Sequence, residues 1–198
     1  MSEADRQKWQ RRYAAGEYEE RTHPTRMLEE WLPALPRPQG ARALDLACGA
    51  GRNALFLAAQ GYRVDAMDIS SIALERAAAS ASKSGLKVDW IEVDLDDAAL
   101  TTQRYDLVVV SRYVNRALSG DIAAALRDGG YLLYEQHLRT GREVGGPGSA
   151  QFRVAPNELL RMFPALRVLY YREAIIDDPD GATMALAQMV ACKGSPGF

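Results

Sequence analysis

Three aspartates and two glycines in the first half of this 198-residue chain have the types and positions that indicate chemistry. Gly49 and Gly51 follow an apolar run that contains Asp45, and a helical pattern begins directly after them. Because glycine has no Cβ atom, a ligand can lie against the backbone of such a turn, and the free N–H groups of a helix start favour negative charge. Asp68 and Asp94 each end a later apolar run. The pattern predicts a ligand site where strands end and a helix begins.

The glycine turn by itself fits more than one cofactor. Residues 49–54 satisfy the pattern G-x-G-x-x-G/A, and Asp68 follows at about the spacing of a ribose-binding acid in nicotinamide-dependent oxidoreductases. Against that reading, Asp45 would hold a fixed negative charge where a pyrophosphate would lie, and Asp94 repeats the position of Asp68 one strand later. These features favour a ligand other than a dinucleotide.

The elements that must position these residues alternate between strand and helix patterns from about residue 41 onward. Such alternation predicts a parallel sheet wrapped by helices, and a short turn around residues 177–181 predicts an antiparallel final pair of strands. One or two amphipathic helices are expected within residues 1–36, and a long mobile loop over residues 139–156. Strands are expected at 41–47, 62–67, 87–93, 105–111, 131–137, 166–171 and 183–192, and helices at 52–60, 71–84, 120–126 and 157–163.

Length and composition predict a single domain over residues 1–198, with an N-terminal helical cap (1–38) and a core (40–193). A net charge of −2 gives no basic field for nucleic acid. No apolar run approaches the roughly 20 residues that cross a bilayer, and the charged N-terminus lacks the apolar segment of a signal peptide. Cys48 and Cys192 are expected as free thiols, and no Cys/His spacing indicates a metal site. We expect a cytoplasmic protein without nucleic-acid or membrane partners.

Five segments of the chain occur in a fixed order that is typical of one family. They are LDLACGAGRN (44–53), VDAMDIS (64–70), VDL (93–95), YDLVVVS (105–111) and GGYLLYE (129–135). The set resembles the motifs of class I S-adenosylmethionine-dependent methyltransferases. The resemblance implies an α/β, Rossmann-like fold: a seven-stranded, mostly parallel sheet with the last strand antiparallel, helices on both faces and an N-terminal helical cap. It also implies S-adenosylmethionine as cofactor and S-adenosylhomocysteine as product.

The same resemblance assigns roles around the cofactor. Asp68 would accept both ribose hydroxyls, Ile69 and Leu95 would enclose the adenine, and Asp94 would accept from its amino group. Backbone carbonyls near Ala47 and Ser111 would meet the ammonium of the methionine part, with Asp45 nearby. The residues expected to bind the cofactor are Asp45, Ala47, Gly49, Gly51, Arg52, Asn53, Asp68, Ile69, Asp94, Leu95 and Ser111.

Within this class, the chain resembles small bacterial methyltransferases of the tellurite-resistance type. The likeness rests on residues 48–70, on Tyr13 with Arg21-Thr22-His23 ahead of the sheet, and on PNELLRMF (156–163). Tellurite-type enzymes are expected to carry His and Arg on the loop between the last two strands, whereas residues 176–183 here are acidic and contain neither. This departure argues against a metalloid substrate. Residues 111–114 also lack the Asn/Asp-Pro-Pro-aromatic turn of enzymes that methylate nucleic-acid amines.

Methyl transfer from a sulfonium is an in-line displacement, so the enzyme must chiefly align the reactants in a dry pocket. Catalytic candidates at the pocket mouth are His137, His23 and Tyr113, and substrate-binding candidates are Tyr13, Arg112 and Arg116. Several arginines after the fourth and fifth strands (Arg112, Arg116, Arg139, Arg142 and Arg153) predict an anionic substrate if they converge.

We therefore expect a small-molecule methyltransferase, monomeric or homodimeric, that acts on a soft or activated S, O, N or metalloid nucleophile. Two alternatives stay open: a non-catalytic S-adenosylmethionine-binding protein and an NAD(P)-dependent oxidoreductase.

Overall fold

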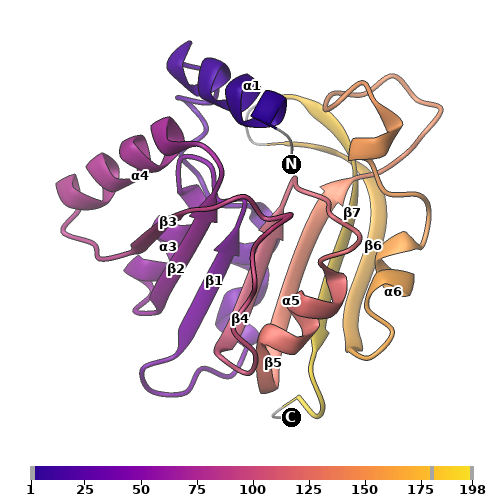
Figure 1. Cartoon of the computed structure of the whole chain (residues 1–198). Coiled ribbons are helices and arrows are strands. Elements are labelled where there is room, and N and C mark those ends of the chain that lie inside the picture. Colours follow the sequence, from indigo (N-terminus) through magenta and orange to yellow (C-terminus); the bar gives the residue numbers. More distant parts are fainter. Residues whose placement is uncertain (1–2, 179–180, 197–198) are drawn as a thin grey trace.

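The computed structural model describes residues 3–178 and 181–196 and consists of one sheet with helices against both faces (Figure 1). The strands are β1 (Arg42–Leu46), β2 (Arg63–Asp68), β3 (Asp89–Glu92), β4 (Tyr105–Ser111), β5 (Leu126–His137), β6 (Arg167–Asp177) and β7 (Thr183–Cys192). The α-helices are α1 (Glu3–Ala14), α2 (Arg26–Trp31), α3 (Arg52–Ala59), α4 (Ser71–Lys83), α5 (Ser119–Ala125) and α6 (Glu158–Met162). Two short 3-10 helices lie at Leu32–Ala34 and Ala150–Phe152. None of the helices in the described ranges has the length and apolarity of a membrane span.

The sheet has the order β3-β2-β1-β4-β5-β7-β6. The pairs among β1 to β5 are parallel, whereas β7 pairs antiparallel with both β5 and β6. The predicted Rossmann-like sheet, with its last strand antiparallel, is therefore confirmed.

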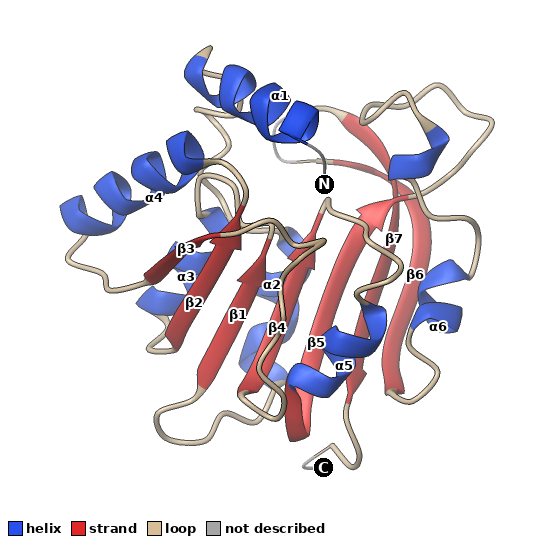
Figure 2. Ribbon diagram, viewed as in Figure 1, coloured by secondary structure: helices blue, strands red, loops and turns tan. Residues whose placement is uncertain are grey.

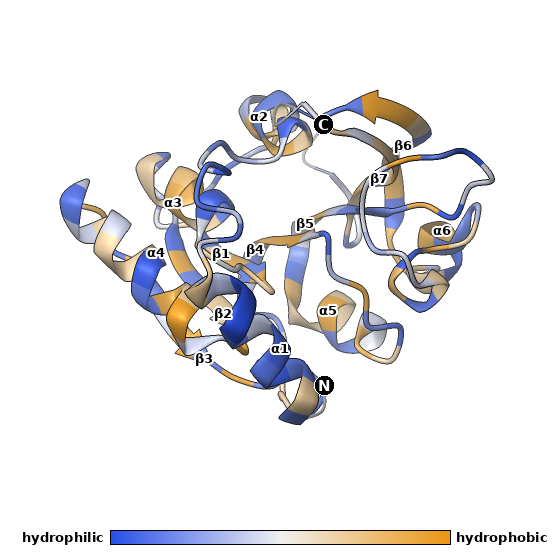
Figure 3. Cartoon of the chain, turned by 90° about the horizontal axis from the view of Figure 1, so that it is seen from above, coloured by the Kyte–Doolittle hydropathy of each residue, from blue (hydrophilic) through white to orange (hydrophobic). Residues whose placement is uncertain are grey.

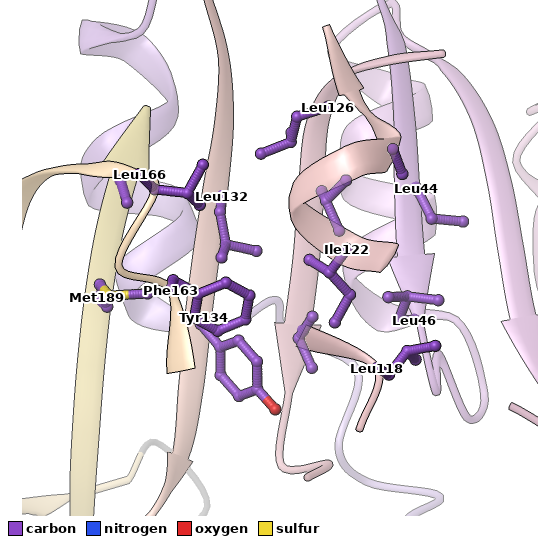
Figure 4. Close-up of a cluster of buried hydrophobic side chains, with 14 of the residues drawn as sticks. Leu44, Leu46, Leu118, Ile122, Leu126, Leu132, Tyr134, Phe163, Leu166 and Met189 are labelled. Atoms are coloured by element: carbon purple, nitrogen blue, oxygen red, sulfur yellow. The ribbon is translucent and has the colours of Figure 1, made fainter. Parts of the chain in front are cut away.

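Alternate residues of the central strands contribute to two separate hydrophobic cores, one on each face of the sheet. On one face Leu44, Leu46 and Tyr134 pack with Ile122 of α5 and with Phe163, which follows α6 (Figure 4). On the other face, side chains of the same strands pack against α2, α3 and α4, which lie with α5 and α6 in two layers around the sheet (Figure 2). Because β1 and β4 are covered on both faces, their sequences are apolar almost throughout, as expected for central parallel strands.

Helix α1 lies above the carboxyl ends of the parallel strands, beside α4 (Figure 3). The prediction of an amphipathic helix is wrong for this segment, because none of its side chains is buried. It is instead attached by polar contacts: Arg6 donates to the Ile69 carbonyl and to Glu92, and Gln10 donates to the Ser71 hydroxyl. Helix α1 therefore covers the strand ends without joining a core.

Two strands extend well beyond the sequence prediction. β5 begins at Leu126 rather than at residue 131, because Gly129 (φ 78°) and Gly130 form an irregularity in the strand instead of a turn that precedes it. A Cβ atom on Gly130 would lie 2.9 Å from the carbonyl oxygens of Tyr105 and Arg127, so only glycine fits. β6 continues to Asp177 because it pairs with β7 as far as Thr183.

Candidate functional site

A cavity of about 730 Å³ lies at the carboxyl ends of the central strands, beneath α1. Ligands bind at this edge of open α/β sheets. The predicted site residues that line the cavity are Tyr13, Ala47, Gly49, Arg52, Asn53, Asp68, Ile69, Leu95, Ser111, Arg112, Tyr113, Arg116 and His137. The cavity thus brings together segments from the N-terminal cap, from the glycine turn and from the ends of β4 and β5.

The glycine turn between β1 and α3 has the backbone form that its sequence predicts. Gly49 (φ 55°) and Gly51 (φ 81°) are both in the left-handed region, which favours glycine. A Cβ atom on Gly49 would collide with the hydroxyl of Tyr13 from the cap. One on Gly51 would lie 2.6 Å from the Trp90 ring and 2.9 Å from the Cβ of Ala77. Gly49 therefore faces the cavity, whereas Gly51 allows α3 to pack against its neighbours.

Two buried carboxylates accept the N–H groups of this turn and helix start. Asp45 is 1% exposed, and its Oδ2 accepts the Ala54 N–H at 3.0 Å. Asp68 accepts the Gly49 N–H through Oδ2 at 2.8 Å and the Ser70 N–H through Oδ1 at 2.9 Å. Burial raises the pKa of Asp45 to about 7, and burial also raises the pKa of Asp68. Both acids therefore hold the turn in place, and Asp68 does so from the cavity wall.

Four predicted site residues are not among the residues that line the cavity: Asp45, Gly51, Asp94 and His23. Asp45 lies behind the turn, and Asp94 accepts the Asp96 N–H in the loop after β3. The backbone carbonyl of His23 accepts from Arg52. In this structure the neighbouring Asp96, which the sequence analysis does not single out, lines the cavity instead of Asp94.

Three arginines converge at the end of the cavity near β4 and β5. Arg112 bonds Glu135 (Nε to Oε1, 2.9 Å) and pairs with Asp178 (Nη2 to Oδ2, 3.3 Å). Arg21 of the cap pairs with the same Asp178 oxygen at 3.9 Å, and Arg52 donates to the Ser111 hydroxyl at 3.3 Å. Burial, followed by the charges of Arg112 and Arg21, lowers the pKa of Arg52. Three guanidinium groups therefore stand against two buried carboxylates here, which leaves one positive charge in excess within this group.

His137 ends β5 beside these arginines and is 7% exposed. Burial, together with the charges of Arg112, Arg153 and Arg21, lowers its pKa to about 3. The imidazole is therefore neutral at physiological pH, and its Nδ1 is buried without a hydrogen-bond partner among the described residues. Burial raises the pKa of the neighbouring cavity residue Tyr113 to about 12, so its hydroxyl keeps its proton.

The loop over residues 139–156 is held in place largely by arginine side chains. Arg153 donates to the carbonyls of Pro147, Leu138 and Gly145. Arg116 bonds Glu158 and donates to the carbonyls of Gln151 and Arg153. Arg139 donates to the Ala150 carbonyl. Five arginines were candidates for an anion site. Arg112 and Arg116 line the cavity, and of these two only Arg112 pairs with buried acids.

At Gly146 this loop passes directly over the ring of His137. Its φ is 100°, and a Cβ atom would lie 2.5 Å from Nδ1 of His137. We expect Gly146→Ala to lower the free energy of unfolding by about 1–3 kcal/mol, because the loop or the ring must move. Gly148→Ala, where a Cβ atom would meet nothing within 4 Å, is the matched control and should change it by less than about 0.5 kcal/mol. Urea unfolding measures the free energy of unfolding of both variants, and equal stabilities would contradict the close contact between Gly146 and the His137 ring.

Several residues that line the cavity were not predicted from the sequence, because they come from segments without a motif. They are Trp9, Arg12, Tyr18, Gln136, Gly146, Pro147, Gln151, Phe152 and Met184, together with Lys8, Asp5 and Asp96. Arg21 lies within the segment that carries the likeness to the tellurite-resistance type, which is the one signal that could have identified it.

The residues present fit S-adenosylmethionine better than a dinucleotide. The N–H groups that would receive a pyrophosphate are already accepted by carboxylates, at Gly49 by Asp68 and at Ala54 by Asp45. Asp68 remains on the cavity wall as an acceptor for hydroxyls, with Ile69 and Leu95 as apolar surfaces beside it. Asp68, Ile69 and Leu95 would hold the nucleoside, and Arg52 and Ser111 would meet the methionine part.

Comparison with known proteins gives a consistent result. A family model described as a methyltransferase domain matches residues 43–130. The S-adenosyl-L-methionine-dependent Diels-Alderase iccD of Talaromyces variabilis is 33% identical over 129 residues, which are 60% of this chain and 44% of iccD. The probable S-adenosyl-L-methionine-dependent methyltransferase TehB of Haemophilus influenzae is 30% identical over 139 residues, 67% of this chain and 48% of TehB.

The chain thus spans about half the length of the curated relatives it matches. The crystal structure of TehB from Haemophilus influenzae superposes with a TM-score of 0.70 at 25% identity, covering 84% of this chain and 61% of TehB. The family model shows a methyltransferase domain over residues 43–130, and the sheet order and these likenesses show that the chain is similar to class I S-adenosylmethionine-dependent methyltransferases of the TehB type.

Proposed function

We propose that this protein transfers the methyl group of S-adenosylmethionine to a soft or activated nucleophile of a small anionic molecule. The observation that carries the proposal is that one cavity joins Asp68 and the glycine turn to Arg112 and His137. The cofactor, when bound, supplies an activated methyl group. The charge of the arginines supports an anionic acceptor, since a negative group there would lower their mutual repulsion.

The residues of the chain would then bind and orient the two reactants and exclude water from them. Asp68 would hold the nucleoside, and Arg112 would fix the acceptor. Helix α1 and the loop at Phe152, which Lys8 of α1 contacts at 5.3 Å, would close the cavity from above. Burial and the charges of Arg112, Arg153 and Arg21 lower the pKa of His137, and a neutral, buried imidazole is a poor base toward a hydroxyl or an ammonium group. This favours a nucleophile that arrives deprotonated, such as a thiolate, and leaves His137 as a hydrogen-bond partner.

The alternatives are a protein that binds S-adenosylmethionine without methyl transfer and an NAD(P)-dependent oxidoreductase. Calorimetry with S-adenosylmethionine and with NADH should give binding of the first only. Release of S-adenosylhomocysteine should then be measured across thiols, phenols and inorganic oxyanions, each in charged and neutral forms. We expect release with at least one anionic thiol. Binding of S-adenosylmethionine without release from any acceptor would contradict methyl transfer and favour the non-catalytic alternative.

A further inference from the structure

Arg112 lines the cavity, and hydrogen bonds satisfy its guanidinium only in part. Its side chain is 10% exposed, and its Nη1 is buried with no hydrogen-bond partner among the residues that the structure describes. A buried donor without a partner costs about 1–3 kcal/mol, and more when it is charged. Since Arg112 lines the cavity, a bound acceptor atom would remove this cost.

The other nitrogen atoms of Arg112 are fixed from behind. Glu135 is 2% exposed, holds Nε through Oε1, and its second oxygen Oε2 accepts from Gln188 at 2.7 Å. Asp178 is 8% exposed and faces Nη2. Neither acid is among the residues that line the cavity. Two buried carboxylates therefore orient the guanidinium and leave Nη1 unpaired among the described residues, an arrangement that suits recognition of a planar anion.

The rest of the surroundings favours an organic acceptor. The cavity, at about 730 Å³, is in the upper part of the range of about 300–1,000 Å³ for small-molecule sites, which leaves room for a second molecule beside the cofactor. Phe152, whose carbonyl accepts from Gln136, and Met184, which packs near Gly145, line it close to His137. An inorganic oxyanion would leave these apolar surfaces without a contact.

We propose that Arg112, oriented by Glu135 and Asp178 and assisted by Arg21, binds the carboxylate of the methyl acceptor, which is a small organic acid with an apolar body. This inference rests on the proposed function and adds the substrate class to it. The carboxylate serves to anchor the acceptor, because pairing with a guanidinium reduces its own nucleophilicity. The nucleophile is a different atom of the same molecule.

The test uses benzoate and benzamide as probes that differ in charge but share their shape. Each is titrated by calorimetry into the protein saturated with S-adenosylhomocysteine, with orthophosphate and tellurite as inorganic arms. We expect benzoate to bind at least about 10-fold more tightly than benzamide, and Arg112→Met to remove this preference. Arg142→Met, at an exposed position of the loop outside the cavity lining, should preserve it.

Because Arg112→Met leaves Glu135 and Asp178 buried without their partner, Arg112→Lys is measured beside it. Lysine keeps the positive charge but lacks the second arm of the guanidinium, so we expect a loss of benzoate affinity with native S-adenosylhomocysteine affinity. Equal binding of benzoate and benzamide, no binding of benzoate, or tighter Arg112-dependent binding of orthophosphate or tellurite would each overturn the inference. If the wild-type protein fails to bind S-adenosylhomocysteine, the proposed function itself is overturned.

Discussion

Replacing Asp68 by alanine is expected to lower the affinity for S-adenosylhomocysteine by about 100-fold or more. The side chain lines the cavity, is 8% exposed and accepts the N–H groups of Gly49 and Ser70. Alanine would remove the acceptor proposed for the ribose hydroxyls and leave two backbone donors without a partner. Both losses act on the cofactor, since the glycine turn and the nucleoside position depend on the same carboxylate.

The measurement is calorimetric titration with S-adenosylhomocysteine, with urea unfolding as the check on folding. Asp68→Asn keeps one oxygen acceptor at the same place, so its affinity should lie between those of the wild type and the alanine variant. Asp128→Ala, at an exposed position at the start of β5, is the control and should bind as the wild type does. A folded Asp68→Ala protein with wild-type affinity would show that Asp68 does not hold the cofactor.

Much of the fold could be predicted because its signals are local. The continuous run YDLVVVS at 105–111 is β4 as expected, buried on both faces of the sheet. Ser70 caps α4 by accepting the Ala73 N–H, and the tight connection between the last two strands makes them antiparallel. In each case residues within a few positions of one another determine the structure.

The parts that were wrong depend on contacts between distant segments. Helix α1 was expected to be amphipathic, but it is held by polar bonds to residues that follow β2. The extent of β6 is set by its partner β7, because its own residues alternate poorly between buried and exposed. The sequence of α1, which is polar almost throughout, already argues against an apolar face, whereas the extent of β6 is not visible in its own segment.

The candidate site divides in the same way. The residues of the glycine turn and the ends of β2 and β3 follow from motifs, and most of them line the cavity. The positions of the acids that orient Arg112 do not follow from motifs, because these acids lie 23 and 66 residues from it in the sequence. Among five arginines of similar sequence context, the positions of buried carboxylates distinguish Arg112, the one proposed to bind the acceptor. The substrate end of the cavity is therefore a property of the fold, whereas the cofactor end is a property of the sequence.

Asp45→Asn is expected to remove the contribution that titration of Asp45 makes to the pH dependence of stability. Burial raises the pKa of Asp45 from 3.8 to about 7, opposed by Arg52 and the Ala54 N–H and assisted by Asp68. Between these two values Asp45 of the folded protein holds a proton that the unfolded chain releases, so the contribution of Asp45 to the free energy of unfolding falls as pH rises. The slope approaches about 1.4 kcal/mol for each pH unit, which amounts to a few kcal/mol by about pH 7.

Asparagine has the same shape and can still accept the Ala54 N–H, but it carries no charge at any pH. The variant should therefore match the wild type near pH 4 and exceed its stability by a few kcal/mol at pH 8, where the wild type must bury an ionised carboxylate. Urea unfolding at pH 5, 6, 7 and 8 measures this difference. Asp68 also has a raised pKa and is present in both proteins, so the difference between the two profiles reports Asp45 together with its coupling to Asp68. Parallel stability profiles would mean that Asp45 stays ionised throughout, held by Arg52, and that the charge behind the glycine turn is permanent.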